Sequence, residues 1–293
     1  MAKQPKSLNG KVVAITGGAR GIGKATAQAL VRQGARVGIG DLDVELARQT
    51  ASELGSGTRA YELDVTSRPS FAAFLDSVES DLGPVDVLVN NAGIMPLGPF
   101  VEEDDITARR LVDVNVHGVM HGMKVVLPRF LERNRGHLVN IASTAGKAGF
   151  PGGATYCGTK HFVVGVSEAV RAEVRETPIE VSCVMPGVVN TELAAGLQQA
   201  RGVKNVNPED VANGIVEALQ RPHFDVYVPK SIGPINKVMG VLPRSGREAF
   251  ARALKADKVL ASADPNARKG YELRASHSEP GLEEGEDQKQ LTA

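Results

Sequence analysis

Short apolar runs alternate with helix-forming segments along most of the chain, and this alternation restricts the possible folds more than any other sequence feature. The runs, which are rich in β-branched residues, occupy positions 11–16, 36–40, 59–63, 85–89, 136–141, 179–185 and 224–228. Since these runs are nearly continuously apolar, both faces of each predicted strand are expected to be buried. Helices are predicted at 22–33, 44–54, 67–82, 104–133, 155–176 and 208–220. Such alternation predicts an α/β fold with a doubly wound parallel sheet of seven strands.

A glycine-rich turn joins the first predicted strand to the first predicted helix. It reads Thr16-Gly17-Gly18-Ala19-Arg20-Gly21-Ile22-Gly23. Glycines let the backbone approach a pyrophosphate closely, and the helix N-terminus offers free N–H groups to the phosphates. A glycine triplet alone also fits a flexible turn, but its place between a strand and a helix favours a dinucleotide site. The predicted cofactor-binding residues of this loop are Gly17, Ala19, Arg20, Gly21, Ile22 and Gly23.

Two acidic residues end the second and third predicted strands. Asp41, followed by Leu42, could accept hydrogen bonds from both ribose hydroxyls of an adenosine and would repel a 2′-phosphate, which favours NAD over NADP. Arg20 favours NADP instead, because its guanidinium could pair with that phosphate. The other interpretation is that Arg20 is a solvated cation of the loop. Asp64, followed by Val65, could hold the adenine amino group or cap a turn.

Tyr156 and Lys160 occupy positions i and i+4 of a predicted helix, so both side chains project from one face. A tyrosine and a lysine four residues apart, without other motifs, are usually two exposed residues on the surface of a helix. Tyrosine titrates at about 10, and we expect the ammonium of Lys160 to lower the pKa of Tyr156 and make it a general acid and base. Ser143 follows the preceding strand and could hydrogen-bond the same substrate oxygen. Asn115 lies inside the predicted helix 104–133, where a local distortion that holds water would explain it.

The order of these motifs resembles that of the classical short-chain dehydrogenase/reductase family. The resemblance runs from about residue 11 to residue 228 and includes Asn90-Asn91-Ala92-Gly93 and the turn Pro186-Gly187, which Thr191 follows. It implies the strand order 3-2-1-4-5-6-7, and a homodimer or homotetramer. It also implies that Tyr156 moves the proton, that Ser143 positions the substrate oxygen, and that Lys160 binds the nicotinamide ribose. Asn115 would hold a water that extends the proton relay. The further cofactor contacts that the resemblance implies are Asn91, Ala92, Gly93, Tyr156, Lys160, Pro186, Gly187, Val189 and Thr191.

Other chemistry has little support in the sequence. His117 and His121 have a spacing that metal ligands use, but no third ligand lies nearby, so no metal site is predicted. Ser143 lacks the Gly-x-Ser-x-Gly turn of hydrolases. Cys157 and Cys183 do not make a disulfide framework and are expected to be small buried residues. Zero net charge and an aromatic content of 4% argue against nucleic acid as a partner.

The chain is predicted to have three parts. Residues 1–229 form a Rossmann-type dinucleotide-binding and catalytic domain. Residues 230–262 form a basic extension, since positions 229–258 contain seven Lys or Arg and two Asp or Glu; it could cover the substrate crevice, contact another subunit or lie on a membrane surface. Residues 263–293 are polar and are predicted to be a disordered tail. With no signal segment and no spanning run of apolar residues, we expect a cytoplasmic protein.

These features together predict an oxidoreductase that transfers a hydride between NAD(H) and the carbinol or carbonyl carbon of a lipophilic secondary alcohol or ketone. The expected crevice is bordered by largely apolar or small residues at 95–97, 149–153 and 188–205. Arg201 is the arginine there that could hold a carboxylate. One alternative is an NADPH-dependent carbonyl reductase, which Arg20 would favour. Another is a dinucleotide-binding regulator without catalysis, against which Ser143, Tyr156 and Lys160 argue.

Overall fold

A seven-stranded parallel sheet forms the centre of the protein in a computed structural model, which describes residues 4–55, 57–200 and 204–277. Its strand order is β3-β2-β1-β4-β5-β6-β7, so the predicted doubly wound sheet and its order are confirmed. The strands are β1 (Val12–Thr16), β2 (Arg36–Asp41), β3 (Thr58–Glu62), β4 (Val87–Asn90), β5 (Gly136–Ile141), β6 (Ile179–Pro186) and β7 (Asp225–Val228). The order reverses between β1 and β4, and such a switch point opens a crevice at the carboxyl ends of the strands.

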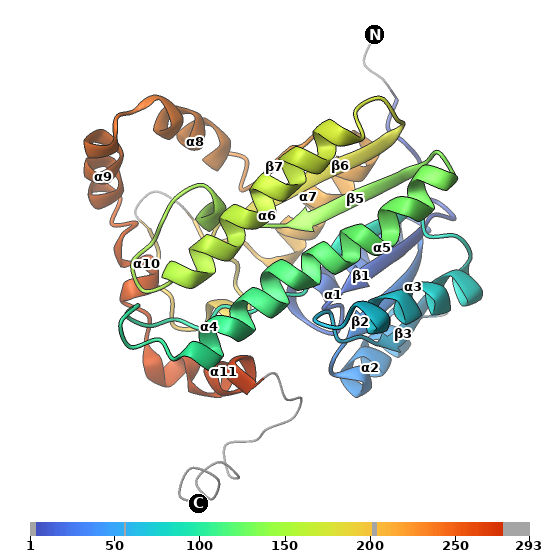
Figure 1. Ribbon diagram of the computed structural model, residues 1–293, viewed down its shortest axis with the longest axis horizontal. Coiled ribbons are helices and arrows are strands. Elements are labelled where there is room, and N and C mark those ends of the chain that lie inside the picture. The colour runs from blue at the N-terminus through green and yellow to red at the C-terminus, as the bar shows by residue number, and fades with distance from the viewer. Residues whose placement is uncertain (1–3, 56, 201–203, 278–293) are drawn as a thin grey trace, which may run out of the picture.

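Helices cover both faces of this sheet. The helices that follow the first six strands are α1 (Gly21–Arg32), α2 (Val44–Leu54), α3 (Arg68–Leu82), α4 (Asp105–Val112), α5 (Gly118–Glu132), α6 (Ala154–Glu173) and α7 (Pro208–Gln220). One hydrophobic core joins α3, α5 and α6 to the sheet, and a second core joins α1, α2 and α7 to the other face. Figure 1 shows α5 and α6 running side by side across the near face.

The two cores explain why the strands are continuously apolar. In β1, Val12 and Ala14 belong to the first core, whereas Val13 and Ile15 belong to the second. Successive side chains of a strand point to opposite faces, so a sheet covered on both sides needs apolar residues at every position. The helices begin where the sequence provides caps: Ser67 accepts a hydrogen bond from Ser70 N at the start of α3, and Asp43 accepts one from Leu46 N at the start of α2.

The helix predicted at 104–133 is interrupted by a π-helical turn at Asp113–His117, which separates α4 from α5. Asn115 lies at the centre of this turn and is fully buried. The helical backbone then continues past Pro128 to Glu132. The local distortion expected around Asn115 is therefore present.

As far as residue 277, four helices follow β7, namely α8 (Ile232–Val241), α9 (Arg244–Ala253), α10 (Lys258–Ala261) and α11 (Pro265–His277). Figure 1 shows them, in orange to red, along the side of the molecule toward which the arrowhead of β5 points. The helix α11 lies within the segment predicted to be disordered, so that prediction is wrong for residues 265–277. The prediction of disorder rested on the low apolar content of the segment, whereas α11 is held largely by polar contacts. Arg268 is 2% exposed and donates hydrogen bonds to three backbone carbonyl oxygens. The rest of the predicted tail, 278–293, lies outside the described residues.

Phe71 offers a test of the core on the α3 face of the sheet. The side chain is fully buried and packs against Phe74 with ring centroids 6.2 Å apart. We expect Phe71→Ala to lower the free energy of unfolding by about 3–5 kcal/mol, because it leaves a cavity. Phe100, which is 68% exposed, provides the control, and Phe100→Ala should change that energy by less than about 0.5 kcal/mol. Chemical denaturation of both variants measures the difference, and equal midpoints would contradict the packing described.

Candidate active site

A cavity of about 680 Å³ lies at the carboxyl ends of the strands. Its wall includes most of the residues that the sequence predicts to bind the cofactor or to act in catalysis. Three predicted residues are not part of the wall. Ala19 and Gly23 lie behind it in the glycine-rich turn, and Asn115 lies beneath the loop that follows β4. Arg201, the arginine that could hold a carboxylate, lies outside the described residues.

The glycine-rich turn after β1 has a backbone that larger residues would not tolerate. Gly17 and Gly21 have φ angles of +64° and +54°, which L-residues rarely adopt. A Cβ atom at Gly23 would lie 2.1 Å from the carbonyl oxygen of Gly17, so α1 can approach the turn only with glycine there. The α1 N-terminus has no side-chain cap at Arg20. Its N–H groups are therefore suited to a phosphate, and the turn fits the pyrophosphate of a dinucleotide.

Asn91 and Thr16 brace this turn from the end of β4. The side-chain amide of Asn91 donates to the carbonyl oxygens of Thr16 and Gly17, both at 2.9 Å. The Thr16 hydroxyl accepts from the backbone N–H groups of Asn91 and Ala92, each at 3.0 Å. Asn91, Ala92 and Gly93 line the cavity, as the sequence predicts. The Asn91 side chain itself serves to join the two strand ends.

Asp41 ends β2 at the cavity wall with both carboxylate oxygens bonded to backbone. It accepts from Ala19 N at 2.9 Å and from Asp43 N at 3.2 Å. Burial raises the pKa of Asp41, and these two hydrogen bonds offset part of that rise. Arg20 lies nearby and is engaged by acids: its guanidinium is 2.6 Å from Asp43 and 3.5 Å from Glu192. Leu42 also lines the cavity.

Asp64, whose role the sequence left open, caps a turn. Its Oδ1 accepts from both the backbone N–H and the hydroxyl of Thr66, at 2.9 and 2.7 Å. Asp64 and Val65 nevertheless belong to the cavity wall on the side of Asp41. On the opposite side, the segment after β6 contributes Pro186, Gly187, Val189 and Thr191. Thr191 faces the glycine-rich turn, since a Cβ at Gly21 would lie 3.5 Å from its methyl group.

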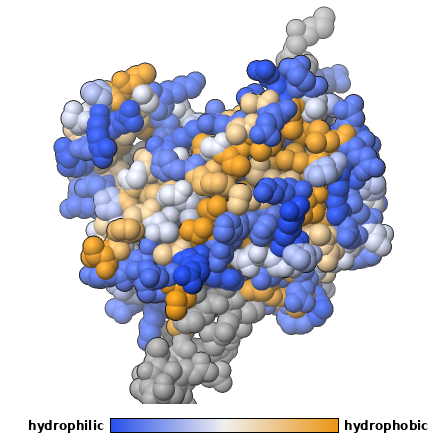
Figure 2. Space-filling model, in the orientation of Figure 1, coloured by the Kyte–Doolittle hydropathy of each residue, from blue (hydrophilic) through white to orange (hydrophobic). Residues whose placement is uncertain are grey.

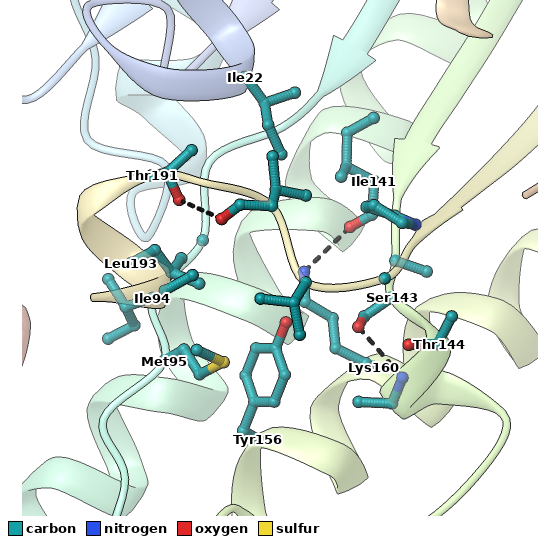
Figure 3. Close-up of a pocket in the computed structure, with 18 of the residues that line it drawn as sticks. Ile22, Ile94, Met95, Ile141, Ser143, Thr144, Tyr156, Lys160, Thr191 and Leu193 are labelled. Carbon is teal, nitrogen blue, oxygen red and sulfur yellow. Dashed lines mark hydrogen bonds between the residues drawn. The ribbon is translucent and has the colours of Figure 1, made fainter. Parts of the chain in front are cut away.

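Tyr156, Lys160 and Ser143 come together in the cavity. Figure 3 shows the Tyr156 hydroxyl directed toward the region where Lys160 Nζ and Ser143 Oγ lie. The ammonium of Lys160 is 5.8 Å from the centre of the Tyr156 ring and donates to the carbonyl oxygen of Ile141 at 3.0 Å. Ser143 accepts from Ala145 N at 3.1 Å at the start of a 3₁₀ turn, Thr144–Gly146, and its side chain lies close enough to Tyr156 to act on the pKa of that phenol. The helix α6 and the end of β5 thus supply one polar cluster.

The protonation of this cluster differs from the sequence expectation. Burial raises the pKa of Tyr156 to about 12, although the hydrogen bond from Ser143 offsets part of the rise. Burial lowers the pKa of Lys160 to about 8. The expected lowering of the Tyr156 pKa by Lys160 is therefore not found. The physical reason is desolvation, because both side chains are less than 10% exposed and each disfavours its own charged form.

Asn115 holds the loop after β4 against α6. Its carboxamide accepts from Ile94 N and donates to Ile94 O, both at 2.9 Å, and it also donates to Thr159 Oγ1 at 3.1 Å. The π-helical turn presents this side chain toward the loop rather than along the helix surface. Asn115 therefore positions the residues that precede Met95 in the cavity wall.

Helices of the C-terminal extension form a large part of the wall, which sequence reasoning did not assign to particular residues. The wall includes Ile235 and Met239 of α8, Phe250 and Ala251 of α9, Val259 and Leu260 of α10, and Tyr271 and Arg274 of α11. The extension therefore contributes to the cavity wall, which agrees with the first of the three interpretations given for it. The periodic apolar residues of α8 were a usable signal, whereas α11 offered no comparable apolar periodicity, because polar Tyr271 and Arg274 are among its cavity-facing residues.

Within residues 4–55, 57–200 and 204–277, no group of three or more His, Cys, Asp or Glu side chains could hold a metal ion. His117 binds Asp113 Oδ1 at 3.0 Å, and His121 binds the carbonyl oxygen of Val65 at 3.0 Å. In the same part of the chain, no helix is both long enough and apolar enough to cross a bilayer.

Comparisons with known proteins agree with this arrangement. The short chain dehydrogenase family model matches residues 11–202. The sorbitol dehydrogenase of Cereibacter sphaeroides is 39% identical over 186 residues, which cover 63% of this chain and 73% of that protein. The 3-alpha-(or 20-beta)-hydroxysteroid dehydrogenase of Mycobacterium tuberculosis is 35% identical over 214 residues, covering 71% of this chain and 82% of that protein. The glycine betaine reductase ATRR of Emericella nidulans is 36% identical over 227 residues, but the chain spans only 18% of that protein.

A solved structure extends the agreement to three dimensions. The crystal structure of a short chain dehydrogenase/reductase from Burkholderia phymatum in complex with NAD superposes with a TM-score of 0.74 at 26% identity, covering 80% of this chain and 94% of that one. The fold, the glycine-rich turn and the Ser-Tyr-Lys cluster define an oxidoreductase of the Rossmann type. The chain belongs to the short-chain dehydrogenase family.

The pKa of Lys160 leads to a prediction about stability. Between pH 8 and pH 10.5 the unfolded lysine binds more protons than the folded one, so the contribution of Lys160 to the free energy of unfolding rises with pH in that window. Lys160→Met removes this dependence. The free energy of unfolding of the parent, minus that of the variant, should therefore increase between about pH 7 and about pH 9.5. Guanidinium denaturation at each pH measures the free energy of unfolding of the parent and of the variant. Lys124→Met, at an exposed lysine, is the matched control. If the parent-minus-variant difference does not change with pH, Lys160 is not desolvated as described.

Proposed function

We propose that this protein is an NAD(H)-dependent dehydrogenase acting on a lipophilic secondary alcohol or the corresponding ketone. The observation that carries the proposal is the buried cluster of Tyr156, Lys160 and Ser143 in one cavity with the glycine-rich turn. A dinucleotide held with its pyrophosphate at the N-terminus of α1 would extend along the strand ends toward that cluster. The nicotinamide supplies or accepts the hydride, and the protein supplies orientation and proton transfer.

Each polar residue of the cluster has a role in this proposal. Because burial raises the pKa of Tyr156 to about 12, its phenol is protonated at neutral pH and can give a proton to a carbonyl oxygen during reduction. Ser143 hydrogen-bonds the same oxygen and holds it beside Tyr156. Lys160, with a pKa lowered to about 8, titrates near neutral pH and would return a proton to Tyr156, besides binding the nicotinamide ribose. Asn115 would hold the water through which that proton comes from solvent.

Removal of the Tyr156 hydroxyl tests the assigned proton donor. We expect Tyr156→Phe to lower kcat by at least about 100-fold, a typical contribution of general acid–base catalysis, with NADH affinity changed less than threefold. The assay follows NADH absorbance with a panel of lipophilic secondary alcohols and ketones. Tyr61→Phe, which removes a phenol that hydrogen-bonds Asp81 on the surface, is the matched control. Full turnover by Tyr156→Phe would refute the assignment.

The choice of NAD over NADP follows from the charges around the adenosine end of the cavity. Asp41 stands at the end of β2, where an adenosine ribose is held in folds of this kind. Arg20, the cation that could attract a 2′-phosphate, is already paired with Asp43 and Glu192. A 2′-phosphate would therefore meet Asp41 without a free guanidinium from Arg20 to compensate its charge.

A comparison of cofactor affinities tests this preference. NADH should bind at least about tenfold more tightly than NADPH, and Asp41→Asn should narrow the ratio, because it removes the repelling charge while keeping an acceptor for Ala19 N. Fluorescence titration of the reduced cofactors gives both constants. Asp225→Asn, at an exposed acid on β7, should leave the ratio unchanged. Tighter binding of NADPH by the parent would favour the alternative of an NADPH-linked carbonyl reductase.

The apolar character of the substrate rests on the cavity wall next to Tyr156. Met95, Cys157, Val259 and Leu260 form a buried hydrophobic cluster with Tyr156, and Leu97 and Phe150 pack against it. The two dehydrogenase relatives described above carry the names of a polyol and a steroid substrate, so they do not decide between the two classes. In the panel, turnover of small polyols together with inactivity toward every lipophilic compound would overturn this assignment.

The proposal includes a homodimer or homotetramer in the cytoplasm. Figure 2 shows hydrophobic residues gathered over the face that α5 and α6 form in Figure 1. The partly buried apolar residues of those helices include Val125, Leu127, Phe162, Val166 and Val170. A second copy of the chain would remove this apolar surface from water. Attachment to a membrane surface remains a lesser alternative for the basic extension.

A further inference from the structure

One face of α11 forms part of the cavity wall although the helix is polar. Arg268 and Ala275 are 2% and 4% exposed, and Tyr271 and Arg274 line the cavity between and beside them. Positions 268, 271 and 275 are spaced by three and four residues and so lie on one side of a helix. This face brings side chains from the end of the described chain next to loops from its middle.

Arg268 ties α11 to both loops that border the crevice. Its guanidinium donates to Met95 O at 2.7 Å in the loop after β4, and to Leu193 O and Ala195 O at 2.9 and 3.0 Å in the segment after β6. Its Nε donates to Glu272 at 2.6 Å, which compensates its charge. A buried guanidinium with these partners uses the planar arrangement of its donors, which a lysine cannot reproduce.

Tyr271 is held in place from two sides. Its ring lies under Arg268, with the guanidinium carbon 5.1 Å from the ring centre. Its hydroxyl oxygen accepts a hydrogen bond from Met95 N at 2.7 Å. Since Met95 N is the donor in that bond, the hydrogen of the phenol remains able to donate to another group.

Tyr271 belongs to the same part of the cavity as Tyr156. Met95, whose backbone N–H binds the Tyr271 hydroxyl, packs in one hydrophobic cluster with Tyr156, and Figure 3 shows its side chain beside the Tyr156 ring. Burial raises the pKa of Tyr271, and the nearby Tyr156 adds to the rise, so Tyr271 is a neutral donor throughout the range in which an enzyme would work.

We propose that Tyr271 is a specificity-determining residue that donates a hydrogen bond to a second oxygen of the substrate, with Arg268 as the positioning residue that holds it. The inference rests on the proposed function and narrows it, because Tyr156 and Ser143 already serve the reacting oxygen. The preferred substrate is then a lipophilic ketone or alcohol with another acceptor oxygen close to the reacting carbon, such as a hydroxyketone or a dione. A buried donor left without an acceptor disfavours the analogue that lacks this oxygen.

Two ketones that differ only in the second oxygen test the role of Tyr271. The probes are 2,3-octanedione and 2-octanone, each reduced with NADH by the parent and by Tyr271→Phe. We expect Tyr271→Phe to lower kcat/KM for the dione at least about tenfold, which corresponds to about 1.4 kcal/mol. The kcat/KM for 2-octanone should change less than about twofold. A structural role alone would affect both ketones equally, and that result, or no effect on either, would overturn the proposal.

A second pair of variants tests Arg268. Arg268→Lys and Arg268→Met should both reproduce the selective loss for the dione, mainly through a higher KM, because neither side chain can bind three carbonyl oxygens and cover the Tyr271 ring at once. The affinity for NADH should stay within about threefold of the parent in both variants. Lys269→Met, at the exposed neighbouring position, should leave selectivity unchanged. Rescue of full dione selectivity by Arg268→Lys would contradict the positioning role.

The proposed function and this inference fail in different ways. Absence of NADH binding, or full activity of Tyr156→Phe, would remove the proposed function. If the parent binds NADH but reduces neither ketone, binding of the dione is measured by the change it causes in nicotinamide fluorescence. Weaker dione binding by Tyr271→Phe than by the parent would still support Tyr271. Equal binding, or no binding to the parent, would overturn the inference.

Discussion

Burial of both faces of the parallel sheet is the constraint on which the rest of this structure depends. Apolar residues occupy most strand positions, and the polar residues that line the cavity gather at the ends of the strands. At the carboxyl ends of β1, β2, β4 and β5, the chain turns away from the sheet at Gly17, Asp41, Asn91 and Ser143. The cavity is the place where these turns meet, and the bonds from Asn91 to Thr16 and Gly17 hold two of them together.

Desolvation sets the chemistry of the cavity. Tyr156 and Lys160 are both buried, and each keeps the neutral form over a wider pH range than it would in water. Charge pairing alone would have made the phenol more acidic. Burial has the larger effect, so the cluster favours a neutral phenol beside an amine that titrates near neutral pH. This is a suitable starting state for giving a proton to a carbonyl oxygen.

The C-terminal helices turn an open crevice into an enclosed site. A doubly wound sheet provides the cofactor side of such a site, but the other walls must come from segments that vary between proteins. Here α8, α9 and α10 provide apolar side chains, and α11 provides Tyr271 and Arg274. Because the carbonyl oxygens that Arg268 binds come from two different loops, the position of α11 and the shape of the crevice depend on each other.

The sequence by itself determined the sheet, its helices and the residues around the glycine-rich turn, because apolar periodicity and glycine placement are local signals. It also predicted the distortion at Asn115, since an amide is disfavoured inside a regular helix. Only the tertiary structure decided that Arg20 is paired with Asp43 and Glu192, that burial outweighs Lys160 at Tyr156, and that α11 is ordered against the cavity. Each of these depends on partners far apart in the chain, and a polar segment such as 265–277 gives no local sign of the backbone carbonyls that will bind it.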